Sequence, residues 1–178
     1  MTTAHPIRRR VLALDVRPQR AGYAVFEGAG RLLDAGLTIR RTGADIQGQL
    51  KAVFQIYRPH VLLIRRIERR SRRNHPRTRV NLRTARRLAF ALNIRIVQIS
   101  EQQIRAYFEN ADVYSKYQIA SSLASTFPEL AHRLPPARKL WQSERARMSI
   151  FDAVSYGVAY FALLSTTDGN ILTGNLQG

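Results

Sequence analysis

The chain has 178 residues, of which 45% are hydrophobic and 8% aromatic, so it can bury the core of one domain of ordinary size. This composition excludes a wholly disordered chain. The formal net charge is +17 at pH 7, and 26 of the 29 basic side chains are arginine. Because arginine binds phosphate oxygens through two parallel hydrogen bonds, the charge predicts a phosphate-bearing partner, and nucleic acid fits best.

The positive charge is concentrated in the middle of the chain. Residues 1–60 carry ten basic and four acidic side chains, residues 61–100 carry twelve and one, and residues 101–178 carry seven of each. The sequence therefore predicts one basic region rather than a uniformly charged protein.

The sequence also bears on the cellular compartment. The chain has no cysteine, which suits a reducing cytoplasm. The apolar run after Arg8–Arg10 ends at Asp15 and is too short for the core of a signal peptide. No apolar run approaches the roughly 18 residues of a membrane-spanning helix. We therefore expect a soluble cytoplasmic protein that does not bind membranes.

The first forty residues have the pattern of three strands, predicted at Val11–Asp15, Ala21–Glu27 and Leu32–Ile39. The connectors around Pro18 and Gly28 are short, which favours an antiparallel meander.

A helix is predicted at Ala44–Tyr57, where apolar residues recur at helical spacing. Val61–Ile64 is continuously apolar and suits a parallel strand buried on both faces. A second helix follows at about Arg77–Leu92, and a further strand at Ile94–Ile99. This alternation of helix and strand is typical of parallel strand pairing.

The last third of the chain reads as helices. Ser100 with Gln103, and Ser115 with Gln118, fit the capping box that opens a helix. Ser143 is a candidate cap for the last helix. Its apolar stripe consists of Met148, Phe151, Ser155, Val158, Ala159 and Ala162.

Together these elements predict an α/β domain with a mixed five-stranded sheet flanked by helices. We expect a basic segment at residues 1–9, a single domain at residues 10–164, and a flexible polar tail at residues 165–178.

Residues 65–87 hold eleven arginines and one glutamate. A solvated surface usually mixes both signs of charge, so this stretch predicts a binding surface for nucleic acid phosphates. An acidic protein partner and a disordered segment remain open alternatives. The predicted phosphate-binding residues are Arg65, Arg66, Arg69, Arg70, Arg72, Arg73, Arg77, Arg79, Arg83, Arg86 and Arg87.

Several familiar sites are absent from the sequence. There is no phosphate-loop pattern and no helical His-Glu-x-x-His, and the four histidines are too scattered for a zinc cluster. The acidic residue that stands out is Asp15, which ends an apolar strand, where a carboxylate faces either solvent or a site. It can also serve simply to satisfy a turn.

Three segments of this sequence resemble, in order and spacing, segments of the RuvC-type Holliday-junction resolvases, members of the ribonuclease-H-like superfamily. These segments are Val11–Val25, Pro59–Arg65 and Ser149–Ala153. The resemblance covers about residues 10–164. It implies a ribonuclease-H-like fold with a three-strand meander followed by parallel strands. It also implies metal-dependent cleavage of branched DNA, a reaction of DNA recombination and repair.

In that family four carboxylates usually hold two divalent cations, Mg²⁺ or Mn²⁺, about 4 Å apart. The resemblance assigns metal binding and catalysis to Asp15 and Asp152. At the position of the family's strand glutamate stands Arg65, and at its first helical acid stands Ser149. The family carries a glycine two residues after its first aspartate, and Arg17 stands at that position in this sequence. An arginine at a metal-bridging position repels a cation and can itself hold a phosphate.

Glu68, Glu144 and Ser149 are weak candidates for the missing ligands. On a regular strand Glu68 faces away from Arg65 and lies about 10 Å farther along. On a regular helix Glu144 lies about 12 Å before Asp152 and about 80° around the axis. We expect Ser149 to pack rather than to bind metal. Glu68 also stands where the family carries an aromatic residue that unstacks bases at the junction.

Two functions remain open from the sequence. The chain is either a Mg²⁺- or Mn²⁺-dependent endonuclease acting on branched DNA, with Arg65 and Arg66 clamping phosphate, or a binding module that kept the fold and lost the cations. Its partner is branched or duplex DNA in either case, with structured RNA as a further alternative. Resolvases of this type dimerise through the helix that is rich in arginine here, so both a monomer and a homodimer are compatible with the sequence.

Overall fold

The computed structural model describes residues 9–39, 46–67, 75–137 and 146–173, with the side chains described up to residue 166. The predicted basic segment, residues 1–9, lies almost entirely outside the described part.

The centre of the molecule is a five-stranded sheet with the strand order β3-β2-β1-β4-β5. The strands are β1 (Arg10–Val16), β2 (Arg20–Glu27), β3 (Leu32–Ile39), β4 (Val61–Arg65) and β5 (Arg95–Ile99). The first three pair antiparallel, whereas β4 pairs parallel with both β1 and β5. The predicted meander and the predicted parallel strands are both confirmed.

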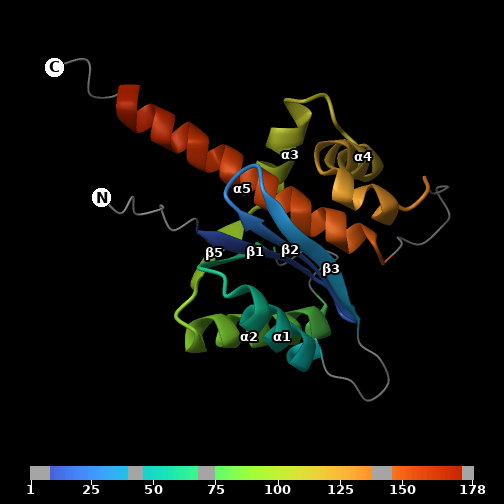
Figure 1. Ribbon diagram of the computed structural model, residues 1–178, viewed down its shortest axis with the longest axis vertical. Helices are drawn as coiled ribbons and strands as arrows, with labels where there is room; N and C mark the ends of the chain where they lie inside the picture. The colour runs from blue at the N-terminus through green and yellow to red at the C-terminus, as the bar shows by residue number, and fades with distance from the viewer. Residues whose placement is uncertain (1–8, 40–45, 68–74, 138–145, 174–178) are drawn as a thin grey trace, which may run out of the picture.

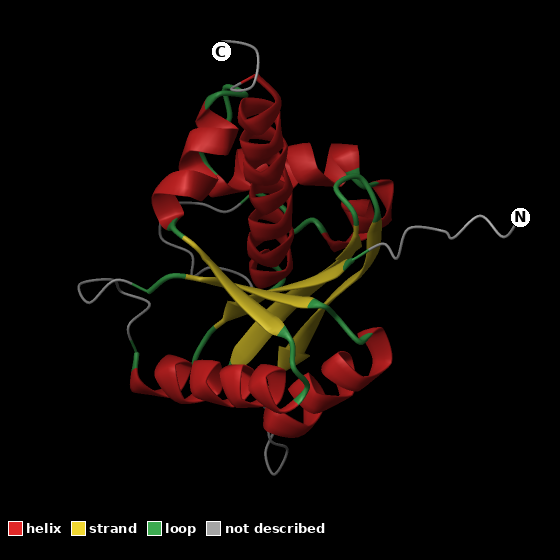
Figure 2. Cartoon of the chain, turned by 90° about the vertical axis from the view of Figure 1, so that its left-hand side faces the viewer, coloured by secondary structure: helices red, strands yellow, loops and turns green. Residues whose placement is uncertain are grey.

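Helices cover both faces of the sheet (Figures 1 and 2). On one face lie α1 (Ile46–Tyr57) and α2 (Pro76–Ala91). On the other lie α3 (Glu101–Glu109), α4 (Lys116–Thr126), the short 3₁₀ helix η1 (Pro128–Arg133) and α5 (Met148–Thr173). Each face has its own apolar core, because successive side chains of a strand point to opposite faces.

This alternation decides which strand residues face α5. On β1, Val11 and Ala13 belong to the core beneath α5, and Leu12 and Leu14 to the core beneath α1 and α2. Asp15 continues the first series and therefore points toward α5. By the same reasoning Arg65, two residues after Leu63 on β4, points to the same face.

The local signals at the helix ends are also confirmed. The side chains of Ser100 and Ser115 each accept a hydrogen bond from the third residue of α3 and α4, and the reciprocal bonds of both capping boxes are present. His75 caps α2, with Pro76 at the first helical position. Ser143, the predicted cap of the last helix, lies outside the described residues, and α5 begins at Met148.

Helix α5 is longer than the sequence predicts. It continues to Thr173 and so covers most of the segment expected to be a tail, while residues 174–178 lie outside the described part. Its stretch Met148–Thr166 is long and apolar enough to cross a membrane, but 56% of that window is buried inside this protein. More than half of this stretch therefore packs against the rest of the protein, as a core helix does.

Two glycines allow α5 to approach the sheet closely. A Cβ atom on Gly22 of β2 would lie 1.9 Å from the backbone oxygen of Ser149. A Cβ atom on Gly157 of α5 would lie 2.1 Å from the ring of Phe26. Because Gly22 pairs with Asp15 across the β1–β2 ladder, this close contact places the first turn of α5 beside the end of β1.

Candidate functional site

Asp15 and Asp152, the two predicted metal ligands, lie at the same place in the fold. Between them lies the guanidinium group of Arg17. Its Nε atom donates to Oδ2 of Asp15 at 2.7 Å, and its Nη2 atom donates to Oδ2 of Asp152 at 2.7 Å. The side chain of Asp15 is 1% exposed, that of Asp152 is 14% exposed and that of Arg17 is 15% exposed. This ion-pair network is therefore largely shielded from water.

Two further groups bind the same carboxylates. The hydroxyl of Tyr156 on α5 donates to Oδ1 of Asp15 at 2.7 Å. The Nζ atom of Lys116, at the start of α4, donates to Oδ2 of Asp152 at 3.2 Å. Among the described residues, two cationic side chains, Arg17 and Lys116, thus contact the carboxylates of Asp15 and Asp152.

Ser149, at the position of the family's first helical acid, is fully buried. Its hydroxyl accepts a hydrogen bond of 3.1 Å from Nε of Arg20. Arg20 begins β2, so a second arginine side chain approaches the first turn of α5 from the sheet. This contact agrees with the expectation that Ser149 packs within the domain.

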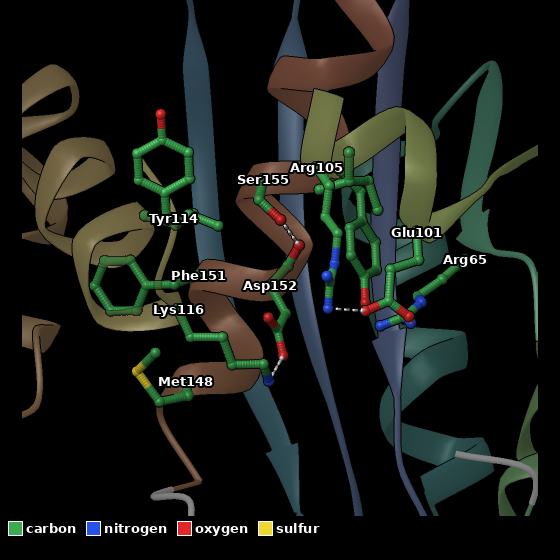
Figure 3. Close-up of a pocket in the computed structure, with 12 residues that line it drawn as sticks. Arg65, Glu101, Arg105, Tyr114, Lys116, Met148, Phe151, Asp152 and Ser155 are labelled. Atoms are coloured by element: carbon green, nitrogen blue, oxygen red, sulfur yellow. Dashed lines mark hydrogen bonds and ion pairs between the residues drawn. The ribbon is translucent and has the colours of Figure 1, made fainter. Parts of the chain in front are cut away.

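Arg65 ends β4 and donates through Nη2 to a carboxylate oxygen of Glu101, at the start of α3. The other oxygen of Glu101 accepts from Nη2 of Arg105 at 3.1 Å. One carboxylate therefore lies between two guanidinium groups, as Figure 3 shows.

These groups line a pocket of about 150 Å³ between β4, α3, α4 and α5 (Figure 3). Its charged wall carries three cations and two carboxylates, and its apolar wall comes from α3, α4 and α5. The lining residues are Arg65, Glu101, Ile104, Arg105, Tyr114, Lys116, Ile119, Met148, Phe151, Asp152, Ser155 and Tyr156.

The arginines of α2 form a separate surface on the other side of the sheet. Five arginines of α2 are exposed: Arg77, Arg79, Arg83, Arg86 and Arg87. Among the described residues, none of these five forms an ion pair. At about 100° per residue, the last four span roughly 100° of the helix circumference. Thr78, Ala85 and Ala89 form the buried face of α2. We call the four residues Arg79, Arg83, Arg86 and Arg87 the α2 arginine face.

The arginines predicted to form one continuous surface are thus divided by the fold. Arg65 lies in the pocket beneath α5, Arg66 is exposed at the end of β4, and the α2 arginine face belongs to the opposite layer. Arg69, Arg70, Arg72 and Arg73 lie outside the described residues, as do the weak candidates Glu68 and Glu144.

No family model matches this sequence, and no curated protein sequence matches it. Solved structures do match. RuvC of Thermus thermophilus has a TM-score of 0.63 at 16% identity, over 88% of this chain and 97% of that one. The T. thermophilus RuvC in complex with a Holliday junction substrate has a TM-score of 0.62 at 15% identity, over the same shares. The yeast mitochondrial Holliday junction resolvase Ydc2 has a TM-score of 0.52 at 12% identity, over 89% of this chain and 80% of that one.

The fold is therefore the ribonuclease-H-like fold, with its mixed sheet in the order β3-β2-β1-β4-β5. Within that fold the structure is similar to RuvC and to a second Holliday-junction resolvase, at low sequence identity. Both the predicted fold class and the resemblance drawn from the three short segments are confirmed.

RuvC-type resolvases use divalent metals, so the fit of this site to a metal pair can be tested on its residues. Of the carboxylates in the described part of the chain, those of Asp15 and Asp152 meet here, and the same guanidinium group binds both. In the described part of the chain no group of three His, Cys, Asp or Glu side chains could hold a metal ion. A cation between Asp15 and Asp152 would have to displace Arg17, so these residues do not fit a divalent metal pair.

The sequence indicates Asp15 and Asp152 but not their partners. Arg17 stands out in the sequence only because it departs from the family's glycine. No sequence signal marks the other residues of this region as site residues: Lys116, Tyr156, Arg20, Glu101 and Arg105. The nearest signals were the capping boxes, which place Glu101 and Lys116 at helix starts. A capping box does not reveal which distant element the first turn of its helix approaches.

Proposed function

We propose that this protein binds branched DNA through the α2 arginine face and does not cleave it. Four arginines on one exposed stripe, without acidic partners among the described residues, suit contacts to successive phosphates. Branched DNA is the proposed ligand because one of the similar structures is RuvC in complex with a Holliday junction substrate. A cytoplasmic location remains part of this proposal.

The observation that carries the absence of cleavage is the position of Arg17. Two-metal cleavage of a phosphodiester needs carboxylates free to hold the cations. Here one arginine binds Asp15 and Asp152 together, and Arg65 stands at a strand end where the family carries a carboxylate. The positive charge between the carboxylates of Asp15 and Asp152 is therefore supplied by the Arg17 side chain.

A second candidate is a metal-dependent endonuclease acting on branched DNA. It is favoured by one observation: the fold brings Asp15 and Asp152 to either side of a single guanidinium group. For this candidate Arg17 would have to leave the carboxylates when substrate and Mg²⁺ or Mn²⁺ arrive.

One experiment distinguishes DNA binding without cleavage from metal-dependent cleavage. A labelled four-way junction, a matched duplex and a single strand are incubated with the protein in Mg²⁺, in Mn²⁺ or in chelator. Cleavage is followed on denaturing gels, and binding is followed by gel shift on the same samples. We expect metal-independent binding that prefers the junction, with no nicking in any sample.

The variant R79Q/R83Q/R86Q tests the binding surface, and R31Q is its control because Arg31 is exposed on the β2–β3 connector. Binding should weaken in the triple variant and persist in R31Q. Nicking that requires metal and disappears in Asp15→Asn would establish the endonuclease instead. If the wild-type protein binds none of the three DNAs even at low salt, the proposed function is wrong.

A further inference from the structure

Two arginines from different elements bind the same carboxylate in the pocket beneath α5. Arg65 comes from the end of β4, Arg105 comes from the second turn of α3, and both donate to Glu101. Figure 3 shows the carboxylate between the two guanidinium groups. A pair of guanidinium groups around one anion is also the arrangement that binds a phosphate group.

The side chains of Arg65, Glu101 and Arg105 differ in exposure to solvent, and this difference affects whether another anion can replace the carboxylate. Arg65 is 13% exposed, whereas Glu101 is 45% and Arg105 is 67% exposed. The more buried arginine is held at the end of a core strand, and the carboxylate lies toward solvent. The ion pair between Arg105 and Glu101 is exposed on both sides and therefore weak, and the Glu101 carboxylate is accessible to water, so an incoming anion can replace it.

From this geometry we propose that Arg65 and Arg105 form a phosphate-binding clamp, and that Glu101 occupies it in the free protein. A phosphodiester group of nucleic acid displaces the Glu101 carboxylate when it binds. The proposal deepens the proposed function, since it adds a second phosphate contact site on the opposite face of the sheet from the α2 arginine face.

The charges that line the pocket support this exchange. With Glu101 in place, the pocket wall carries Arg65, Arg105 and Lys116 against Glu101 and Asp152. Asp152 is already bound by Arg17 and Lys116. Removing the Glu101 carboxylate therefore leaves two arginines at the pocket without an acidic partner among the described residues, and an external anion can bind there.

The test compares Glu101→Gln with Glu109→Gln. Both residues lie on α3 and both substitutions remove one negative charge, but Glu109 is exposed at the far end of the helix and does not line the pocket. Binding of a labelled four-way junction is measured by fluorescence anisotropy over a range of salt concentrations. We expect E101Q to bind about fivefold more tightly than wild type, and E109Q to differ by less than about twofold.

The gain should depend on the clamp. In the double variant E101Q/R65Q the tighter binding should be lost, because Glu101 and Arg65 form one ion pair and their substitutions are coupled. Equal gains in E101Q and E109Q would mean that only net charge matters and would overturn the clamp. A gain that survives in E101Q/R65Q would overturn it as well.

A second measurement separates this proposal from the proposed function. Inorganic phosphate is titrated into each protein while the Nε–Hε signals of the arginine side chains are followed by NMR. Phosphate should shift the Arg65 and Arg105 signals in E101Q at lower concentration than in wild type. If wild type fails to bind DNA, the proposed function fails, and the phosphate titration still decides whether the clamp exists.

Discussion

The Nη2 atom of Arg17 lies 2.7 Å from Oδ2 of Asp152, although the two residues are 135 positions apart in the sequence. Through Nε the same guanidinium group holds Asp15 at 2.7 Å. Arg17 therefore joins the end of β1 to the first turns of α5. Among the described residues Arg17 is the cation that contacts both carboxylates, and Lys116 contacts Asp152 as well.

Arg17→Ala should destabilise the fold strongly. The substitution leaves the carboxylate of Asp15, 1% exposed, without the cation that balances it, and breaking a buried pair in this way costs about 3 kcal/mol or more. Urea unfolding in the presence of chelator measures the change in the free energy of unfolding.

The control for that substitution is Arg31→Ala. Arg31 is 61% exposed and pairs with Glu27 four residues away, so its loss should cost no more than about 1 kcal/mol. Similar losses in the two variants would mean that the Arg17 network contributes no more than a surface ion pair.

Divalent cations should not stabilise the wild-type protein. A ligand that binds only the folded state at 100 times its Kd raises stability by about 2.7 kcal/mol, so a genuine metal site would be visible in thermal unfolding. We expect the same Tm in chelator, in Mg²⁺ and in Mn²⁺. A rise in Tm with Mn²⁺ that disappears in Asp152→Asn would show that the carboxylates bind metal in spite of Arg17.

Salt should weaken DNA binding steeply, and the α2 arginine face should set part of that dependence. Each phosphate contact contributes about 0.9 to the slope of log K against log salt concentration for duplex DNA. The variant R79Q/R83Q/R86Q should reduce the slope by roughly 2 to 3 relative to wild type. An unchanged slope would place the phosphate contacts on another surface.

A tyrosine pair on the other side of the sheet gives a pH-dependent prediction. The hydroxyl of Tyr23 donates to Oδ2 of Asp34 at 2.9 Å, and the hydroxyl of Tyr57 donates to the same oxygen. Burial, and then the hydrogen bond to Asp34, raise the pKa of Tyr23 above its ordinary value of 10.0. For Tyr57 the hydrogen bond to Asp34 is the main cause of the raised pKa, followed by burial.

Since the pKa of each hydroxyl is higher in the folded state, its contribution to stability is complete below pH 10 and is lost as the pH rises beyond it. Tyr23→Phe should lower the free energy of unfolding at neutral pH by about 1–2 kcal/mol, because one bond to a carboxylate is removed. It should also make stability fall less steeply above pH 10. Urea unfolding of both proteins on either side of pH 10 measures the two effects, and parallel pH profiles would contradict the assignment.

The strands and helices of this protein follow largely from local patterns in its sequence. Alternating and continuous apolar runs predict β1 to β5 because a strand buries side chains with period two or on both faces. Capping boxes predict the starts of α3 and α4, since those bonds form within four residues. Short motifs around Asp15 and Asp152 were sufficient to indicate the ribonuclease-H-like fold.

The partners of Asp15 and Asp152, in contrast, depend on contacts between elements that lie far apart in the chain. Arg17 lies two residues after Asp15, yet its contact with Asp152 exists only because α5 packs closely against β2 at Gly22. The same holds for Arg65, whose partner Glu101 begins the helix that follows the neighbouring strand β5, where Ile99 pairs with Arg65. An ion pair depends on distances of a few ångströms between elements, and no local pattern of apolar residues encodes such distances.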